Sequence, residues 1–410
     1  MTDIAMLHYA APPVVGGVES TIYHHARLLA GAGYAVHVIA GRGEAFHPEV
    51  RFHQIPEIDS RHPAVLAAGE SLAAGAAGAP FRDLRDLLTD RLSALLDGVP
   101  VCIVHNALTL HKNLALTAAL EQLNTAGKTR LIAWCHDFAW LDELYTPDLH
   151  PGYPWDLLRT AWPGVRYVTV SAHRRTRLAE LFGLPEEEVR VVTPGVDVYE
   201  FLKLSPLIRE LAERLDLLAA DPLILLPARI TRRKNIEFAV RVTAALAGRV
   251  PHPVLLVTGP PGPHNPKNAA YLQALRALSR DLGVDGQVHF LYEHGEEDRP
   301  LHLTDEAIAD LYRLADILLF PSLREGFGIP VLEAGLVRLP VFAADIPSVR
   351  ESSGEHAVLF DPRGEPAAVA GEIERFLAGD RAHALRRRTL DRFTWQRIVE
   401  NDLLPLLQPE

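Results

Sequence analysis

Short apolar runs recur along this chain and alternate with longer segments in which apolar residues return every three or four positions. Runs of the first kind are typical of buried strands, and segments of the second kind indicate helices with one buried face. Strands are therefore predicted at residues 4–7, 35–40, 101–104, 131–134, 166–171, 189–193, 223–226, 254–257, 288–291, 317–320, 341–343 and 358–360. Because strands and helices alternate, the pattern predicts an α/β protein with parallel sheets.

Amphipathic periodicity predicts helices at residues 18–32, 81–96, 236–246, 308–314 and 395–407. The region between residues 41 and 100 gives a weaker signal, and its segment 62–79, rich in alanine and glycine, fits either a helix or a loop. A further helix is predicted to begin near Pro330, because proline suits the first helical turn. This start would put Glu333 in the first turn of that helix.

The turn between the strand at 317–320 and this helix carries the clearest candidate chemistry. It contains Gly326 and Gly328, so that bare backbone amides at a helix start could hold an anion such as phosphate. Glu325 and Glu333 bracket the turn, and their carboxylates can accept hydrogen bonds from hydroxyl groups. Phosphate donors beside hydroxyl acceptors would suit a nucleotide sugar. Alternatively, Glu325 is a solvated loop residue and Glu333 an ordinary charge near a helix start.

The residues Glu325-Gly326-Phe327-Gly328, followed by Ile329 and by Glu333, resemble the E-x7-E signature of retaining glycosyltransferases of family 4. That family has the GT-B fold, in which two Rossmann-like domains with parallel sheets face each other across a cleft. The resemblance implies that Glu325 contacts the transferred sugar and that Glu333 contacts the ribose of the nucleotide. It also implies that the turn as a whole binds the donor.

The segment Pro194-Gly195-Val196-Asp197 resembles the junction between the two domains of this family, although it lacks the asparagine of the family pattern. We therefore predict an acceptor-side domain at residues 1–194 and a donor-binding domain at residues 195–392. The terminal helix resembles the one that crosses back in this fold, so residues 393–410 are expected to rejoin the first domain.

Gly16-Gly17 precedes the first predicted helix and would place bare amides at its start. The pair resembles the glycine loop whose amides face the donor diphosphate in the family. A simple tight turn is the alternative reading. Because the pattern is not GxGxxG, it gives little direct support to a nicotinamide-binding domain.

Polar residues follow two strands of the first half at their carboxyl ends, which is where open parallel sheets bind ligands. His105 follows one strand, and His136-Asp137 follows the next. Aromatic and acidic residues around them, including Trp140, suit a polyhydroxylated ligand. We predict acceptor contacts for His105, Asp137 and Trp140, and the resemblance implies that His136 reaches the donor sugar. In the alternative reading, His136 binds backbone and the aromatic residues belong to the core.

In the second half, Arg229 and Lys234 follow the strand at 223–226. A guanidinium fork and an ammonium group both suit a diphosphate, and these residues match the positions that hold it in the family. The alternative is that they are surface charges beside other basic residues. Gly259, after the strand at 254–257, is expected to border the nucleotide.

The composition limits the partners and the cellular compartment that the protein is expected to have. The net charge of −11 argues against a nucleic-acid partner. Cys102 and Cys135 lie in apolar runs and are predicted to be buried free thiols. Because no stretch has the length of an integral membrane segment, a cytoplasmic protein is expected. The oligomeric state is not predicted.

The sequence therefore predicts a retaining transferase that moves a hexose from a nucleoside diphosphate sugar to a hydroxyl acceptor such as a sugar or another small polar molecule. A donor linked to UDP or GDP is favoured over one linked to ADP. No Asp-x-Asp motif occurs, so no catalytic metal and no further cofactor are expected. The alternatives are a GT-B epimerase or phosphorylase and a non-catalytic nucleotide-sugar-binding module, with a Rossmann dehydrogenase last.

Overall fold

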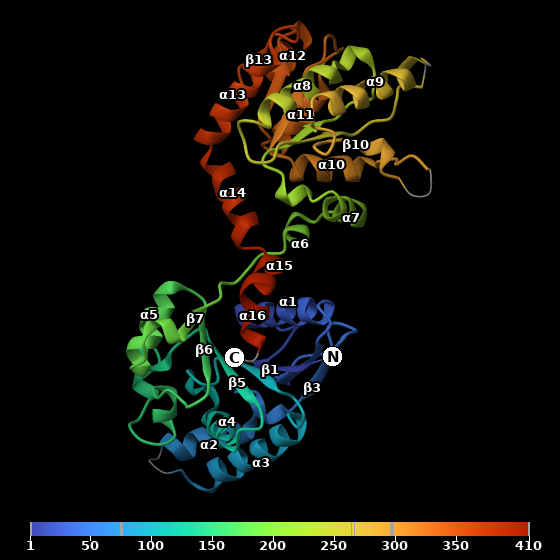
Figure 1. Cartoon of the computed structure of the whole chain (residues 1–410). Helices are drawn as coiled ribbons and strands as arrows, with labels where there is room; N and C mark the ends of the chain where they lie inside the picture. The colour runs from blue at the N-terminus through green and yellow to red at the C-terminus, as the bar shows by residue number, and fades with distance from the viewer. Residues whose placement is uncertain (1, 74–76, 264, 266, 296–298, 409–410) are drawn as a thin grey trace. The chain divides into compact units, whose positions relative to one another are not determined.

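The computed structural model describes residues 2–73, 77–263, 265, 267–295 and 299–408. The chain divides into unit 1, Met1–Val196 with Phe393–Glu410, and unit 2, Asp197–Arg392. Each unit contains one sheet of parallel strands with helices packed against it (Figure 1). The predicted fold class, two Rossmann-like α/β domains, is confirmed. Within the described ranges, no helix is both long and apolar enough to cross a bilayer.

The sheet of unit 1 has seven strands in the order β3-β2-β1-β4-β5-β6-β7. Its strands are β1 Asp3–Ala10, β2 Ala35–Arg42, β3 Val50–Gln54, β4 Val101–His105, β5 Arg130–Cys135, β6 Arg166–Thr169 and β7 Val189–Val191. Strand β3 was not predicted, because it lies at the edge of the sheet and only Val50 in it is buried, so no apolar run marks it. Cys102 and Cys135 are buried free thiols, as predicted.

Helices cover both faces of this sheet. They are α1 Gly17–Gly31, α2 Pro63–Ala73, α3 Ala79–Leu95, α4 Leu114–Ala126 and α5 Ala172–Phe182. Helix α1 buries Ile22, Ala26 and Leu29 in one core cluster, whereas α2, α3 and α4 contribute to another cluster. Of the segment 62–79, the part at 63–73 is thus helical, and residues 74–76 lie outside the described residues.

The C-terminal segment rejoins unit 1, as predicted. It consists of α15 Trp395–Ile398, a π-helical turn Val399–Leu403 and α16 Leu404–Leu407. Helix α15 contacts α1 (Figure 1). In this contact Trp395 stacks on His24, with ring centroids 4.9 Å apart. The guanidinium groups of Arg130 and Arg166 donate to the last carbonyls of α16. These bonds satisfy groups that a helix end leaves without intrahelical partners.

The sheet of unit 2 has six strands in the order β10-β9-β8-β11-β12-β13. Its strands are β8 Leu223–Leu226, β9 Val254–Val257, β10 Val288–Phe290, β11 Ile317–Phe320, β12 Val341–Ala344 and β13 Val358–Phe360. Its helices are α6 Val198–Leu202, α7 Pro206–Arg214, α8 Ile236–Leu246, α9 Lys267–Asp281, α10 Asp305–Leu314, α11 Ile329–Leu336, α12 Pro347–Ser353, α13 Pro366–Gly379 and α14 Arg381–Arg392. Helices α8 and α13 pack together on the sheet.

Helix α14 is attached to the sheet of unit 2 by charged side chains. His383 places Nε2 3.0 Å from Asp221 Oδ1 and Nδ1 3.6 Å from Asp316 Oδ1. Arg386 lies 2.9 Å from the same Asp316 carboxylate, which is almost fully buried. The hydrogen bond to Asp221 and the nearby Asp316 carboxylate raise the pKa of His383 to about 9. The imidazole is therefore a cation at neutral pH.

Protonated His383 is expected to make stability depend on pH. Its folded pKa lies above the ordinary value of 6.5, so its contribution is complete below that pH and is lost as the pH rises through about 9. We expect His383→Gln to lower the free energy of unfolding by about 1–3 kcal/mol at pH 6 and by less at pH 10. Urea unfolding of both chains across this range measures the difference. A difference that does not change with pH would contradict the assignment.

Candidate functional site

Strands β9, β8 and β11 are neighbours in the sheet of unit 2, and the loops that follow them begin at the same carboxyl edge. A cavity of about 410 Å³ lies there. Its lining includes Arg229 after β8, Gly259 after β9, and Pro330 and Glu333 in α11. The structure therefore brings three predicted donor-binding residues, from two loops and helix α11, around one cavity.

The loop containing Gly259 approaches the backbone after β8 very closely. A Cβ atom at this position would lie 2.6 Å from the carbonyl oxygen of Ala228 and 2.8 Å from Cα of Arg229. Contacts this short to backbone atoms are prohibitive, so the position requires glycine. The close approach fixes Arg229 at the rim of the cavity.

Glu325 joins two cations in the turn after β11. Its carboxylate accepts from Lys234 Nζ at 2.5 Å and from Arg233 at 3.1 Å. Lys234 is buried, with 8% of its surface exposed, and its ammonium lies 5.0 Å from the centroid of the Phe320 ring. Burial lowers the pKa of Lys234 against the opposing effect of Glu325. Burial alone would raise the pKa of Glu325, but the hydrogen bond from Lys234 and the charges of Lys234 and Arg233 lower it below its ordinary value.

Sequence reasoning missed the ion pair between Arg233 and Glu325. The run Arg232-Arg233-Lys234 does not indicate that a second cation, besides Lys234, reaches the Glu325 carboxylate. Asn235 follows this run and has a left-handed backbone, with φ of 53°. Its side chain donates to the carbonyl oxygens of Pro321 and Pro362, so the basic turn is held against the loop after β11.

Glu333 lies in the second turn of α11, and the predicted position in the first turn was wrong. Gly328 caps the helix in a left-handed conformation, so that α11 begins at Ile329 and no acidic residue occupies its first turn. The Oε2 atom of Glu333 accepts a hydrogen bond from the hydroxyl of Tyr312 at 2.6 Å. Tyr312 comes from α10, and no sequence spacing relates it to Glu333.

The turn residues Gly326, Phe327, Gly328 and Ile329 directly precede or begin α11. Phe327 exposes 43% of its surface and Ile329 exposes 61%. The backbone amides at this helix start are suited to an anion, and the exposed side chains of Phe327 and Ile329 are accessible to a ligand as well.

Gly328→Ala is expected to destabilise unit 2. Its φ of 94° is strained for any residue with a side chain, which costs about 1–2 kcal/mol. Gly326 offers a matched control, since a Cβ atom there would meet nothing within 4 Å. Urea unfolding should show a loss of about 1–2 kcal/mol for Gly328→Ala and a smaller loss for Gly326→Ala. Equal losses for the two variants would contradict this account.

In unit 1 the candidate residues follow β1, β4 and β5, which are neighbours in the sheet. Gly16 is the N-cap of α1 and Gly17 is its first residue. His105 ends β4, and His136 follows β5, with 3.2 Å between His105 Nδ1 and His136 Nε2. The same edge of the sheet therefore carries a helix start and a pair of histidines.

Asn106 shapes the turn that carries His136, and sequence reasoning did not assign it a role. Its backbone has φ of 60°, and its Oδ1 atom accepts from the backbone amides of His136 at 2.8 Å and Asp137 at 3.2 Å. In the sequence, only the position of Asn106 directly after a predicted strand could have indicated this role. Burial, followed by the charge of Arg174, lowers the pKa of His136 to about 4, so this ring is neutral at pH 7.

The three residues predicted to bind the acceptor differ in accessibility. His105 is fully buried and reaches the site only through His136. The Trp140 indole N–H donates to the backbone carbonyl oxygen of Trp155. The Arg159 guanidinium lies 4.2 Å from the centroid of a Trp140 ring. Asp137 keeps 48% of its side chain exposed and lies 3.5 Å from Arg174.

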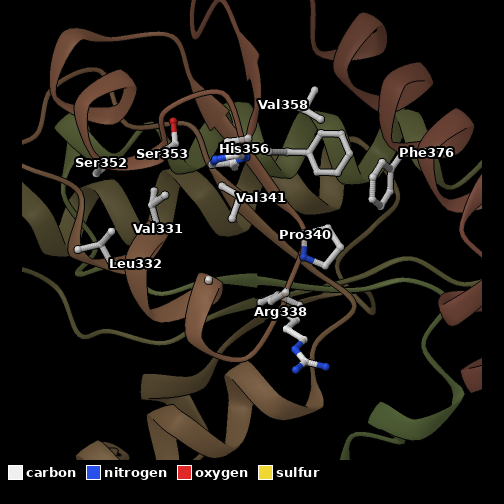
Figure 2. Close-up of a pocket in the computed structure, with 14 residues that line it drawn as sticks. Val331, Leu332, Arg338, Pro340, Val341, Ser352, Ser353, His356, Val358 and Phe376 are labelled. Carbon is white, nitrogen blue, oxygen red and sulfur yellow. The ribbon is translucent and has the colours of Figure 1, made fainter.

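A second cavity of about 450 Å³ lies along α11 in unit 2 (Figure 2). Val331 and Leu332 line it together with Val341, Val358 and Phe376, so that its walls are mainly apolar. It reaches the amino ends of β12 and β13, whereas the cavity lined by Arg229, Gly259 and Glu333 lies at the carboxyl ends of the strands.

Two family models match nearly consecutive parts of the chain. Residues 15–200 match the model described as Glycosyltransferase Family 4, and residues 208–391 match Glycosyl transferases group 1. The chain belongs to the family 4 glycosyltransferases. The predicted family is therefore confirmed, and the two Rossmann-like sheets are those of the GT-B fold.

Curated members of this family resemble part of the chain. A D-inositol 3-phosphate glycosyltransferase of Nocardia farcinica is 30% identical over 220 residues, which are 53% of this chain and 45% of the relative. A GDP-mannose-dependent alpha-(1-6)-phosphatidylinositol monomannoside mannosyltransferase of Mycobacterium tuberculosis is 30% identical over 199 residues, 48% of this chain and 47% of the relative. The chain spans about half the length of these relatives. Among solved structures, a sucrose-phosphate synthase from Thermosynechococcus elongatus is 18% identical, covers 99% of both chains and has a TM-score of 0.40.

Proposed function

We propose that this family 4 member transfers a hexose, with retention of configuration, from a nucleoside diphosphate sugar to a hydroxyl acceptor. The observation that carries the proposal is the Lys234–Glu325 ion pair of 2.5 Å. In a nucleotide sugar, the diphosphate is bonded directly to the anomeric carbon, so phosphate oxygens and sugar hydroxyls are neighbours. A phosphate-binding cation in contact with a hydroxyl-binding carboxylate matches that order of groups.

The leaving diphosphate gains negative charge as the glycosidic bond opens. Fixed cations that face developing charge provide a large catalytic effect, and Lys234 and Arg229 are suited to this role. By resemblance to the family, the amides of Gly16 and Gly17 at the start of α1 are proposed to face the donor diphosphate. These groups would supply the positive charge, so we expect no catalytic metal and no cofactor beyond the nucleotide sugar.

Glu325 and Glu333 would bind the two ends of the donor. Glu325 is proposed to orient the transferred sugar after Lys234 turns to the phosphate. Glu333 has one oxygen bonded to Tyr312, and its placement in the cavity lining suits the ribose hydroxyls. By resemblance to the family, His136 is proposed to contact the donor sugar.

We propose UDP or GDP as the nucleotide rather than ADP, and a sugar or other small polar molecule as the acceptor. The name of one relative, a GDP-mannose-dependent enzyme, and that of another, acting on an inositol phosphate, are consistent with these classes. The buried free thiols fit a reducing compartment such as the cytoplasm.

The test combines UDP- and GDP-linked glucose and mannose with a panel of sugars and polyols. We expect nucleoside diphosphate release that depends on the acceptor, and a product whose anomeric configuration, read by proton NMR, equals that of the donor. An inverted product would contradict retention. Epimerised donor without acceptor would indicate an epimerase, a phosphate requirement would indicate a phosphorylase, and binding without turnover would indicate a non-catalytic module.

A further inference from the structure

The His136 ring is hydrogen-bonded to a second histidine, His105, which is fully buried. We propose that His105 is a positioning residue that holds His136 as the Nδ1–H tautomer and thereby leaves an N–H donor on the accessible side of the His136 ring. This inference rests on the proposed function, in which His136 contacts the donor sugar. It assigns to His105 a role different from the acceptor contact that the sequence suggested.

The surroundings of His105 leave its ring little freedom. It is the last residue of β4 and lies in register with Trp134 of β5. The Trp134 and His105 ring centroids are 5.6 Å apart. His8, at 3.1 Å, donates from Nδ1 to the carbonyl oxygen of His105, since a carbonyl can only accept. Strands on both sides thus hold His105, and its Nδ1 atom remains 3.2 Å from Nε2 of His136.

The direction of this hydrogen bond follows from the other nitrogen of His105. Burial lowers the pKa of both rings, so each is neutral and has one N–H and one bare nitrogen. The Nε2 atom of His105 is buried, and no group in the described ranges bonds to it. If His105 accepted from His136, this Nε2 would carry an unpaired, buried N–H. Such donors are rarer in proteins than unpaired acceptors, so His105 donates from Nδ1.

His136 then accepts at Nε2 and carries its own proton on Nδ1. That atom makes no hydrogen bond to the described parts of the chain, and it does not belong to the buried unpaired atoms. It is therefore open to a ligand. An N–H at this place donates to a hydroxyl or phosphate oxygen of the substrate, whereas a bare nitrogen could only accept from a hydroxyl and would repel a phosphate oxygen.

Nitrogen NMR of the full chain labelled with ¹⁵N-histidine tests the tautomer without any substrate. The His136 signals are assigned from their loss in His136→Gln. We expect a protonated Nδ1 and a bare Nε2 in the unaltered protein. A protonated Nε2 on His136 would overturn the proposal, whatever the activity.

Two variants of equal shape separate hydrogen bonding from packing. In His105→Asn the side-chain amide can donate in place of Nδ1, whereas His105→Leu fills a similar volume and cannot donate. We expect His105→Asn to keep the tautomer and to retain kcat within about threefold, and His105→Leu to give a mixture of tautomers and a kcat lower by about tenfold or more, with a smaller change in donor KM.

An unchanged tautomer in His105→Leu would overturn the proposal. If that variant does not fold, the unaltered protein and His105→Asn decide the question. The expected tautomer in a protein that shows no transfer with any donor would support the role of His105 as the residue that orients His136, and would contradict the proposed function instead.

Discussion

Replacing Arg229 by glutamine and Lys234 by methionine in one chain is expected to lower kcat by about a thousandfold or more. Removing a single donor that faces developing charge typically costs about 10²–10³ in kcat, and here both proposed side-chain cations are lost. Lys234 is buried beside Glu325, and Arg229, although exposed, lines the cavity at the carboxyl edge of the unit 2 sheet. The measurement is nucleoside diphosphate release at saturating donor and acceptor.

The control carries the same two substitutions at exposed positions of the same unit, Arg375→Gln in α13 and Lys267→Met in α9. This chain should keep kcat within about twofold of the unaltered protein, because surface substitutions rarely disturb a fold. Turnover of the Arg229/Lys234 variant within about threefold of the control would remove both residues from the mechanism.

Glu325→Gln is expected to lower kcat by about a hundredfold while leaving the binding of free nucleoside diphosphate intact or stronger. The carboxylate both accepts from Lys234 and is proposed to hold the sugar. Glutamine keeps the shape of the side chain but loses its charge, so Lys234 is free to bind phosphate. The sugar loses a hydrogen bond to a charged acceptor, and such a bond contributes about 1.5–3 kcal/mol. Titration calorimetry with UDP and GDP, combined with steady-state kinetics, measures the two effects separately.

Glu351→Gln, at an exposed position in α12, is the matched control for this variant and should behave as the unaltered protein. Parallel losses of nucleotide binding and of turnover in Glu325→Gln would contradict the separation of roles. An unchanged kcat would show that Glu325 does not orient the sugar.

Strands that are buried on both faces and helices with a strong amphipathic period could be predicted from the sequence with accurate bounds. Strands β8 and β9 and helix α8 begin and end at the predicted residues, because continuous apolar runs or a strong helical period mark them. Strand β3 escaped prediction because an edge strand keeps half of its residues at the surface.

Contacts between distant segments were not predictable from spacing. The sequence indicated Glu325 and Glu333 as a pair, but it did not reveal that Arg233 would bond to the first and Tyr312 to the second. His105 was expected to face the acceptor because it ends a strand, and the structure instead buries it beneath His136. Which polar residue at a strand end faces solvent depends on the packing of neighbouring strands.

The most direct test of the account is a thermal-shift panel with UDP, GDP, ADP and their glucose and mannose conjugates. A ligand that binds only the folded state must stabilise it, by about 2.7 kcal/mol at a hundred times its Kd. We predict that UDP or GDP and one of its conjugates raise Tm of the unaltered chain, and that the shift disappears in the Arg229/Lys234 variant. The absence of a shift with every nucleotide, or an equal shift in that variant, would contradict the assignment of the donor site.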